Sequence, residues 1–169
     1  GMQTIHRRSK GLLEFVENYR KLTRLPSPVR RPVSVRELLL DLHKLYPEEY
    51  IHIELPQQDR IIQIDRAQIE QVLINLIKNA MEACGKKQHP RIDIKVVPGF
   101  AWQCLITVSD NGDGILPDVQ DKIFVPFFST KPNGSGIGLS LCKQIMNRHG
   151  GNITVQSVTG QGCCFTLEF

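Results

Sequence analysis

Cysteine is scarce in this sequence of 169 residues, and long apolar runs are missing. The five cysteines form an odd, scattered set without a Cys-x-x-Cys pair, which excludes a disulfide-rich secreted scaffold. We expect free thiols that serve as small core residues in a reducing compartment. No stretch approaches the roughly 20 apolar residues of a membrane-spanning helix, and the polar, basic start is unlike a signal peptide. We therefore expect a cytoplasmic location without membrane contact for this part of the protein; an inner-membrane anchor in the full-length protein stays open.

The chain also has no large excess of positive or negative charge. The chain has 21 Lys and Arg against 17 Asp and Glu, a formal net charge of +4, and these charges are dispersed. A nucleic-acid-binding protein usually carries a basic stripe, so we expect no nucleic-acid partner. With 41% hydrophobic and 22% charged residues, the composition is that of a globular protein and excludes a disordered chain.

Apolar residues keep a seven-residue step near the N-terminus. The two rows consist of Ile5, Leu12 and Tyr19, and of Phe15 and Leu22. Such a stripe is typical of a coiled coil or helical bundle, and because a helix cannot bury its own seam, we expect a partner helix from outside this sequence or from a second chain. Pro26 and Pro28 end the helix and form a short, stiff linker. We therefore expect a helix and linker over 1–28 and a globular domain over 29–169.

The globular part mixes helical and strand patterns. Ser34 is predicted to cap an amphipathic helix, and Asp65 with Gln68 three residues later predicts a capping box for a long helix that ends near Cys84. Further elements are expected as a helix over about 137–148 and as strands at 51–53, 61–64, 91–97, 101–109, 152–157 and 163–169, the first two on either side of a turn at Pro56. The pattern predicts an α+β fold, a two-layer α/β sandwich with helices on one face of a mixed, mostly antiparallel sheet.

The long helix has a polar face with two asparagines one turn apart. Asn75 and Asn79 lie opposite a clean apolar stripe, although asparagine is a poor helix former. An amide oxygen can ligate Mg²⁺, which prefers oxygen ligands and keeps several waters, and Lys78 beside Asn79 is a candidate for a phosphate contact. Taken alone, the same residues also fit an ordinary solvated helix face.

A second polar segment runs from Asp110 to Ile115, directly after a β-branched strand. A surface turn is one explanation of such a cluster. A calcium loop that begins at Asp110 would need Asp or Asn at its third position and Glu at its twelfth. These positions hold Gly112 and Asp121, which excludes such a loop. A strand-end Asp followed by Gly112 and Gly114 suits a flat ligand that the backbone approaches closely. The Asp110 carboxylate would accept a hydrogen bond from an exocyclic amine such as that of adenine.

A glycine-rich segment opens the last predicted helix. Gly134, Gly136 and Gly138 expose backbone N–H groups at a helix N-terminus, which favours an anion such as phosphate. The segment is not a Walker loop, because Lys131 comes before the glycines, and the G-x-G-x-G spacing is not a Rossmann fingerprint.

Taken together and in this order, the three segments resemble the ATP-binding domain shared by sensor histidine kinases, gyrase, the heat-shock chaperone of that class and mismatch-repair ATPases. The resemblance covers about residues 33–169 and implies ATP and Mg²⁺ as cofactors. It implies that Asn79 ligates Mg²⁺, that Asp110 binds the adenine amino group, and that Lys78 and Lys131 contact phosphate. The remaining implied nucleotide contacts are Asn75, Gly112, Gly114, Ile115, Gly134, Gly136, Ile137, Gly138, Leu139 and Thr166, the last acting on adenine through water.

One position separates two branches of this family. Gyrase-like hydrolases carry a Glu four residues before the magnesium Asn, where this sequence has Asn75. Without a general base to activate water, the site favours transfer of phosphate over hydrolysis of ATP. The N-terminal helix in turn resembles the second helix of a histidine kinase dimerisation hairpin.

The resemblance therefore implies a two-component sensor histidine kinase. Its catalytic domain would transfer the γ-phosphoryl group of ATP to a histidine on a dimerisation helix that this sequence lacks, for relay to a response regulator, and the full-length protein would be a homodimer. None of the five histidines has the expected phosphoacceptor context, so we expect this chain to bind ATP without phosphorylating itself. A gyrase- or chaperone-type ATPase and a nucleotide-free interaction module are the alternatives.

Overall fold

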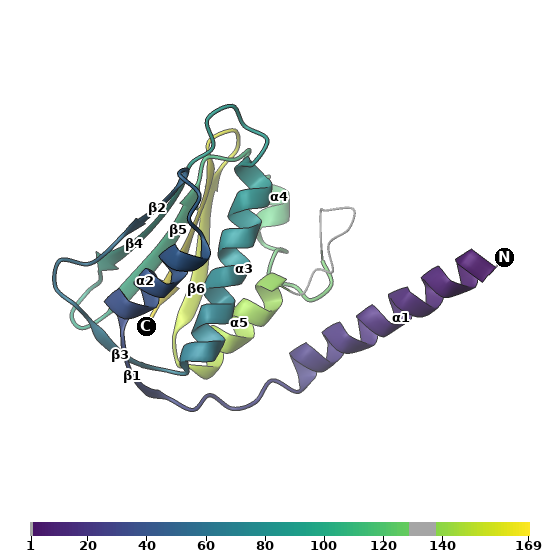
Figure 1. Ribbon diagram of the computed structural model, residues 1–169, viewed down its shortest axis with the longest axis horizontal. Helices are drawn as coiled ribbons and strands as arrows, with labels where there is room; N and C mark the ends of the chain where they lie inside the picture. The colour runs from purple at the N-terminus through teal and green to yellow at the C-terminus, as the bar shows by residue number, and fades with distance from the viewer. Residues whose placement is uncertain (1, 129–137) are drawn as a thin grey trace.

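A five-stranded sheet forms one layer of the protein, and helices cover one of its faces (Figure 1). The computed structural model describes residues 2–128 and 138–169, apart from the side chains of 2–9, 18, 21 and 22. The order across the sheet is β2 (Ile51–Glu54), β4 (Ile92–Pro98), β5 (Cys104–Asp110), β7 (Gly162–Glu168) and β6 (Asn152–Val158). The covering helices are α2 (Val35–Leu45), α3 (Arg66–Cys84) and α5 (Gly138–Arg148). Since β2 is parallel to β4 and the other neighbours are antiparallel, the predicted α+β sandwich with a mixed, mostly antiparallel sheet is confirmed.

The core lies between the sheet and the helices. Alternate residues of each strand point toward the helices, and α3 supplies an apolar stripe at helical spacing. Residues at most 1% exposed in this layer include Ile69, Val72, Leu73, Leu76 and Ile77 of α3 and Ile92, Ile94, Ile106, Val108 and Leu167 of the sheet. Because this stripe fixes the rotation of α3, its opposite face holds the predicted polar residues.

The helix caps are formed at the predicted residues, but one of them binds other partners than expected. Ser34 Oγ accepts the N–H at the start of α2, at 3.2 Å, and Asp65 Oδ1 accepts the Gln68 N–H at 3.3 Å. The return bond of a capping box is not formed, because the Asp65 N–H donates to His149 Nε2 at 3.0 Å. The Gln68 side chain instead donates to Pro26 O at 2.8 Å.

The predicted strands on either side of Pro56 belong to different sheets. β2 pairs with β4, whereas β3 (Ile61–Ile64) pairs antiparallel with β1 (Arg31–Ser34), a strand that we did not predict. Four residues that include Pro32 give no alternation from which a strand can be recognised. Val33 and Ile64 are buried in this small sheet. Their burial stabilises β1 through tertiary packing, which the local sequence pattern does not reveal. A short helix, α4 (Pro117–Gln120), was also not predicted.

The linker before β1 is fastened to the domain by its backbone. Leu25 O accepts from the Arg148 guanidinium at the end of α5, beside the bond from Gln68 to Pro26 O. Farther along, the Val29 N–H donates to Asp65 Oδ2 at 3.0 Å. The linker therefore lies along the start of α3 and the end of α5.

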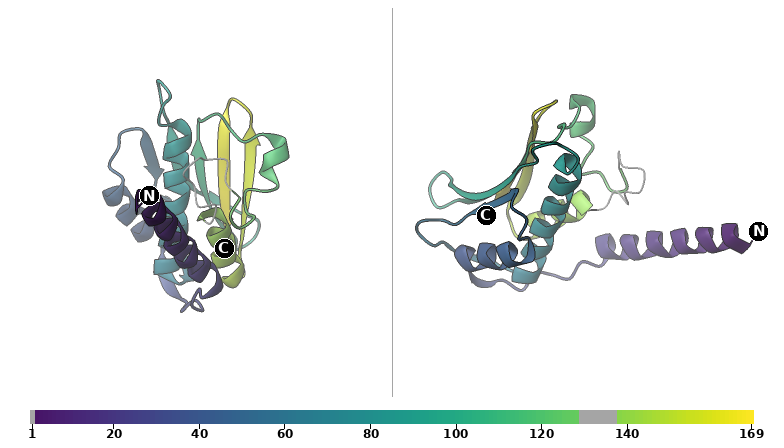
Figure 2. Two further views of the ribbon diagram at one scale, coloured as in Figure 1. Left: turned by 90° about the vertical axis from the view of Figure 1, so that its right-hand side faces the viewer. Right: turned by 45° about the horizontal axis from the view of Figure 1, so that its top comes forward.

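Helix α1 (Met2–Thr23) projects away from the domain as a single helix (Figures 1 and 2). Leu12, Phe15 and Tyr19 are 63%, 52% and 53% exposed, respectively. Phe15 also stacks on Phe127, with 5.2 Å between ring centroids. Within the part of the chain that the structure describes, no helix is long and apolar enough to cross a membrane.

Candidate functional site

Asp110 ends the central strand β5 and points toward the helix layer. Val108 and Ile106, two and four residues earlier, are buried on the same face. The Gly112 N–H donates to Asp110 Oδ1 at 2.8 Å, and the Cys163 N–H donates to the same carboxylate from β7. Burial raises the pKa of Asp110 above its ordinary value, and the two backbone donors oppose this rise. A carboxylate fixed in this way can accept a hydrogen bond from a ligand.

Gly112 and Gly114 allow the segment after Asp110 to pack closely on both sides. A Cβ atom on Gly112 would lie 2.7 Å from Ala83 O at the end of α3. Gly114 has φ +78°, and a Cβ atom there would lie 2.6 Å from Val158 O at the end of β6. Neither position accommodates a side chain. The backbone of residues 112–114 itself therefore forms one wall of the candidate site beside Asp110.

Two side chains that sequence analysis missed hold the same segment. Asn111 bonds to the chain before β4, accepting the Arg91 N–H and donating to His89 O, both at 2.8 Å. Ser157 Oγ on β6 accepts the Ile115 N–H at 2.6 Å, across 42 positions of sequence. Only the pairing of β6 with β7 brings this serine to the segment, so no spacing motif signals it.

The polar face of α3 brings Asn75, Lys78 and Asn79 along one side of the helix. Asn75 links α3 to α5, because its Nδ2 lies 3.4 Å from Gly138 O at the start of α5. Within α3, its Oδ1 accepts a hydrogen bond from Gln71 at 2.9 Å. Asn79 is half-buried and Lys78 is exposed. Gly112 packs against Ala83 near the end of α3. Of the three predicted site residues on α3, Asn79 is the nearest to Ala83 in the sequence.

The glycine-rich segment is described only at its end. Lys131, Gly134, Gly136 and Ile137 lie outside the described residues. Gly138 is the first residue of α5, and Leu139 after it is half-buried against the core. Gly138, whose carbonyl oxygen lies 3.4 Å from Asn75 Nδ2, is therefore at the contact between α5 and α3.

The structure does not bring Thr166 to this site. Thr166 pairs with Thr107, and strand alternation turns both away from the helix layer to which Ile106 and Asp110 point. The β7 residue whose N–H reaches the Asp110 carboxylate is Cys163. The predicted adenine support by Thr166 is corrected accordingly, since a shift of three residues along a strand also changes the face of the sheet.

The donor set around Asn79 can be compared with what Mg²⁺ requires. Among the described residues, no group of three or more His, Cys, Asp or Glu side chains could hold a metal ion. A dedicated cage is thus absent from that part of the chain. Mg²⁺ in nucleotide sites usually combines one or two protein oxygens with waters and substrate phosphates, and the half-buried amide of Asn79 fits such a shared site.

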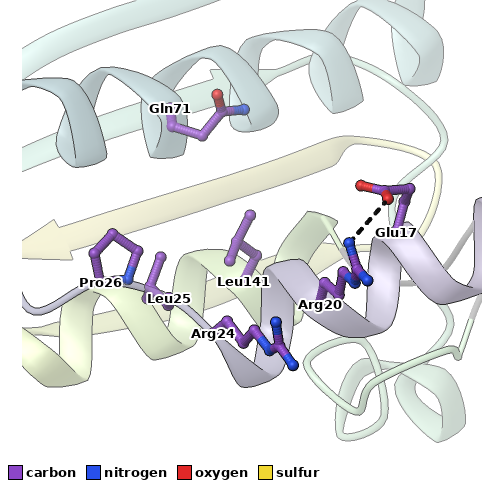
Figure 3. A pocket seen from close by; sticks show the side chains of 7 residues that line it. All are labelled: Glu17, Arg20, Arg24, Leu25, Pro26, Gln71 and Leu141. Carbon is purple, nitrogen blue, oxygen red and sulfur yellow. Dashed lines mark ion pairs between the residues drawn. The ribbon is translucent and has the colours of Figure 1, made fainter.

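A separate hollow of about 470 Å³ lies beside the N-terminal half of α3 (Figure 3). It is lined by Glu17, Arg20, Arg24, Leu25, Pro26, Gln71 and Leu141. Figure 3 shows Gln71 of α3 and Leu141 of α5 on one side and Arg20 of α1, which pairs with Glu17 at 3.8 Å, on the other. The Asp110 segment packs at the opposite end of α3, so the two features are distinct.

Comparisons with known proteins point to one family. The family described as histidine kinase-, DNA gyrase B-, and HSP90-like ATPase matches residues 64–169. Sensor histidine kinase ZraS of Salmonella typhimurium is 41% identical over 106 residues, which are 63% of this chain and 22% of that protein.

Solved structures show the same likeness. The catalytic domain of histidine kinase ThkA, in a nucleotide-free form, is 32% identical with a TM-score of 0.69, over 82% of this chain and 95% of that one. Histidine kinase ThkA in complex with response regulator protein TrrA is 27% identical with a TM-score of 0.76, over 98% of this chain and 49% of that one. By contrast, the chain spans about a fifth of the length of the curated relatives it matches.

Proposed function

Because the chain belongs to the histidine kinase-, DNA gyrase B-, and HSP90-like ATPase family, we propose that it is the catalytic, ATP-binding part of a two-component sensor histidine kinase. The observation that carries this proposal is the Asp110 carboxylate, held by two backbone donors at the end of the central strand. Its free accepting capacity suits the adenine amino group. The backbone wall at Gly112 and Gly114 suits a flat base beside it.

The proposed reaction transfers the γ-phosphoryl group of ATP to a histidine of a dimerisation helix, for relay to a response regulator. Such transfer depends on positioning and charge neutralisation, and Mg²⁺, when bound, neutralises charge on the phosphate oxygens. Asn79 would hold Mg²⁺, and Lys78 and Lys131 would contact phosphate. Asn75 occupies the place of the hydrolases' general base, which favours keeping ATP for transfer.

We also propose that residues 1–28 are part of a dimerisation helix with its linker and that 29–169 are the catalytic domain. The exposed apolar row of α1 supports packing against another helix of a homodimer. The partners would be the phosphoacceptor helices and a response regulator. Such a role goes with a cytoplasmic location, where ATP is available.

Asn79→Ala is expected to slow transfer of radiolabelled phosphate from ATP to a supplied dimerisation hairpin by 10- to 100-fold, roughly the cost of a damaged metal site. The loss has a second readout: ADP affinity should no longer increase when Mg²⁺ is added. Titration calorimetry with and without Mg²⁺ measures this difference.

Glu82→Gln, on an exposed part of the same helix, is the matched control and should behave as wild type. A Mg²⁺-dependent ADP affinity that survives in Asn79→Ala would contradict the ligand assignment. Release of phosphate by the wild-type protein without an acceptor, as fast as transfer, would instead indicate an ATPase.

Adenosine affinity is expected to fall as the pH is lowered, and to do so at a higher pH than it would if Asp110 had the ordinary pKa of an aspartate. The ionised Asp110 accepts the adenine amine, and its pKa is raised by burial. Affinity should therefore be full above the raised pKa and fall as the pH drops through it. Adenosine is the probe, because it has no phosphate to titrate. Asp110→Asn should bind weakly with no such dependence, and an equal pH slope in both proteins would contradict the role of Asp110.

A further inference from the structure

We propose that Ser157 is a positioning residue for nucleotide binding, a role that rests on the proposed function. Ser157 lies on β6, a strand that contributes none of the predicted site residues. Its side chain points to the helix-covered face, as do those of Val155 and Ile153, two and four residues earlier. There it meets the segment that follows Asp110.

The Ser157 hydroxyl uses its full hydrogen-bonding capacity, one donor and two acceptor positions. It accepts the Ile115 N–H at 2.6 Å and the Cys163 thiol at 3.4 Å. Two carbonyl oxygens lie within reach of its proton, Gly162 O at 3.3 Å and Ile115 O at 3.5 Å. One hydroxyl therefore joins β6, the start of β7 and the segment after Asp110.

Two of the Ser157 partners, Cys163 and Ile115, lead to Asp110. The Cys163 N–H donates to the Asp110 carboxylate, and Ile115 ends the segment that begins after Asp110. Between them, a Cβ atom on Gly114 would lie 3.0 Å from Ser157 Oγ, so the wall of the site rests against this hydroxyl.

The other end of the segment has its own attachments. Asn111 bonds to residues 89 and 91, and the Gly160 N–H donates to Asp113 O at 2.6 Å. Ser157 is thus the side chain that holds the end at Ile115. Without its hydroxyl, the Ile115 N–H loses its acceptor, and the segment spends part of its time away from the binding arrangement. Apparent affinity falls by the fraction of time lost.

The test compares two variants of equal shape, Ser157→Thr and Ser157→Val, of which only the first keeps the hydroxyl. We expect Ser157→Thr to bind ADP within about twofold of wild type and Ser157→Val to bind about tenfold more weakly, as expected for a half-buried N–H left without a partner. Adenosine should lose the same factor as ADP, because Ser157 acts at the adenine end. Thr154→Val, on the same strand but on the uncovered face, is the control and should change neither affinity.

Hydrogen exchange at the Ile115 amide, measured without nucleotide, is the second readout. It should be faster in Ser157→Val than in Ser157→Thr. Equal affinities for ADP in these two variants, with binding by the wild type intact, would overturn the role of Ser157 alone. A wild-type protein that binds neither ADP nor adenosine would overturn the proposed function, and the role of Ser157 with it, even where the exchange difference is seen. A loss of thermal stability with unchanged ADP affinity would reduce Ser157 to a structural residue and contradict the proposal.

Discussion

Asp110→Ala is expected to remove most of the thermal stabilisation that ADP with Mg²⁺ gives the wild-type protein. At about 100-fold excess over Kd, a bound ligand adds about 2.7 kcal/mol to the free energy of unfolding. For a chain of this size, this raises the unfolding midpoint by roughly 5–10 °C. The variant loses the charged acceptor for the adenine amine, and a hydrogen bond to a charged group that is left unmade costs about 3 kcal/mol, roughly 100-fold in affinity. Differential scanning fluorimetry measures the shift in both proteins.

Asp113→Ala is the matched control, because this carboxylate lies in the same segment but is 89% exposed and pairs with Lys87. It should keep the ADP-dependent shift, since a surface ion pair contributes little. A full shift in Asp110→Ala would contradict the adenine site. The absence of a shift in the wild type would contradict nucleotide binding itself and favour an interaction module.

Gly162→Ala is expected to destabilise the protein by at least about 3 kcal/mol, a value typical of backbone strain combined with a steric clash. Gly162 has φ +117°, and a Cβ atom there would lie 1.9 Å from Asp110 O. The obstacle is backbone of the neighbouring strand, which cannot rotate aside as a flexible side chain would. The unfolding midpoint should fall by roughly 6–12 °C, as measured by circular dichroism.

Gly160→Ala separates conformational strain from the clash. Gly160 lies in the same turn with φ +82°, but a Cβ atom there has no neighbour within 4 Å. Its replacement should cost only about 1–2 kcal/mol, the strain of a left-handed alanine. Equal losses in the two variants would show that contact with Asp110 is not what demands glycine at position 162.

Local patterns predicted most of the elements and where several candidate site residues lie on them. Ser34 and Asp65 cap helices as expected, since a cap depends on residues three positions apart. The apolar stripe of α3 placed Asn75, Lys78 and Asn79 together on its polar face, because helical periodicity is a property of the segment itself. The strand-end Asp110 with its glycines could likewise be recognised from one short segment.

What local patterns did not predict depends on strand pairing. Position Thr166 was expected near Asp110, but only the register of β5 with β7 reveals that Cys163 lies there instead. Ser157 was missed for the same reason. β1 could not be predicted, because its strand conformation depends on burial of Val33 against β3 and not on an alternating pattern of its own.

The fastened linker determines where α1 can turn. Hydrogen bonds donated by Arg148 and Gln68, and one that the Asp65 carboxylate accepts from the Val29 N–H, hold the backbone from Leu25 to Val29 on the domain surface. The two prolines therefore move with the domain, although a proline-rich linker suggests a joint between two bodies. A swing of α1 would pivot at Thr23 and Arg24, just before the first of these bonds. Because the lever arm begins there, a small rotation at that pivot would move the far end of α1 through a large arc, while the hydrogen-bonded linker backbone stays on the domain surface.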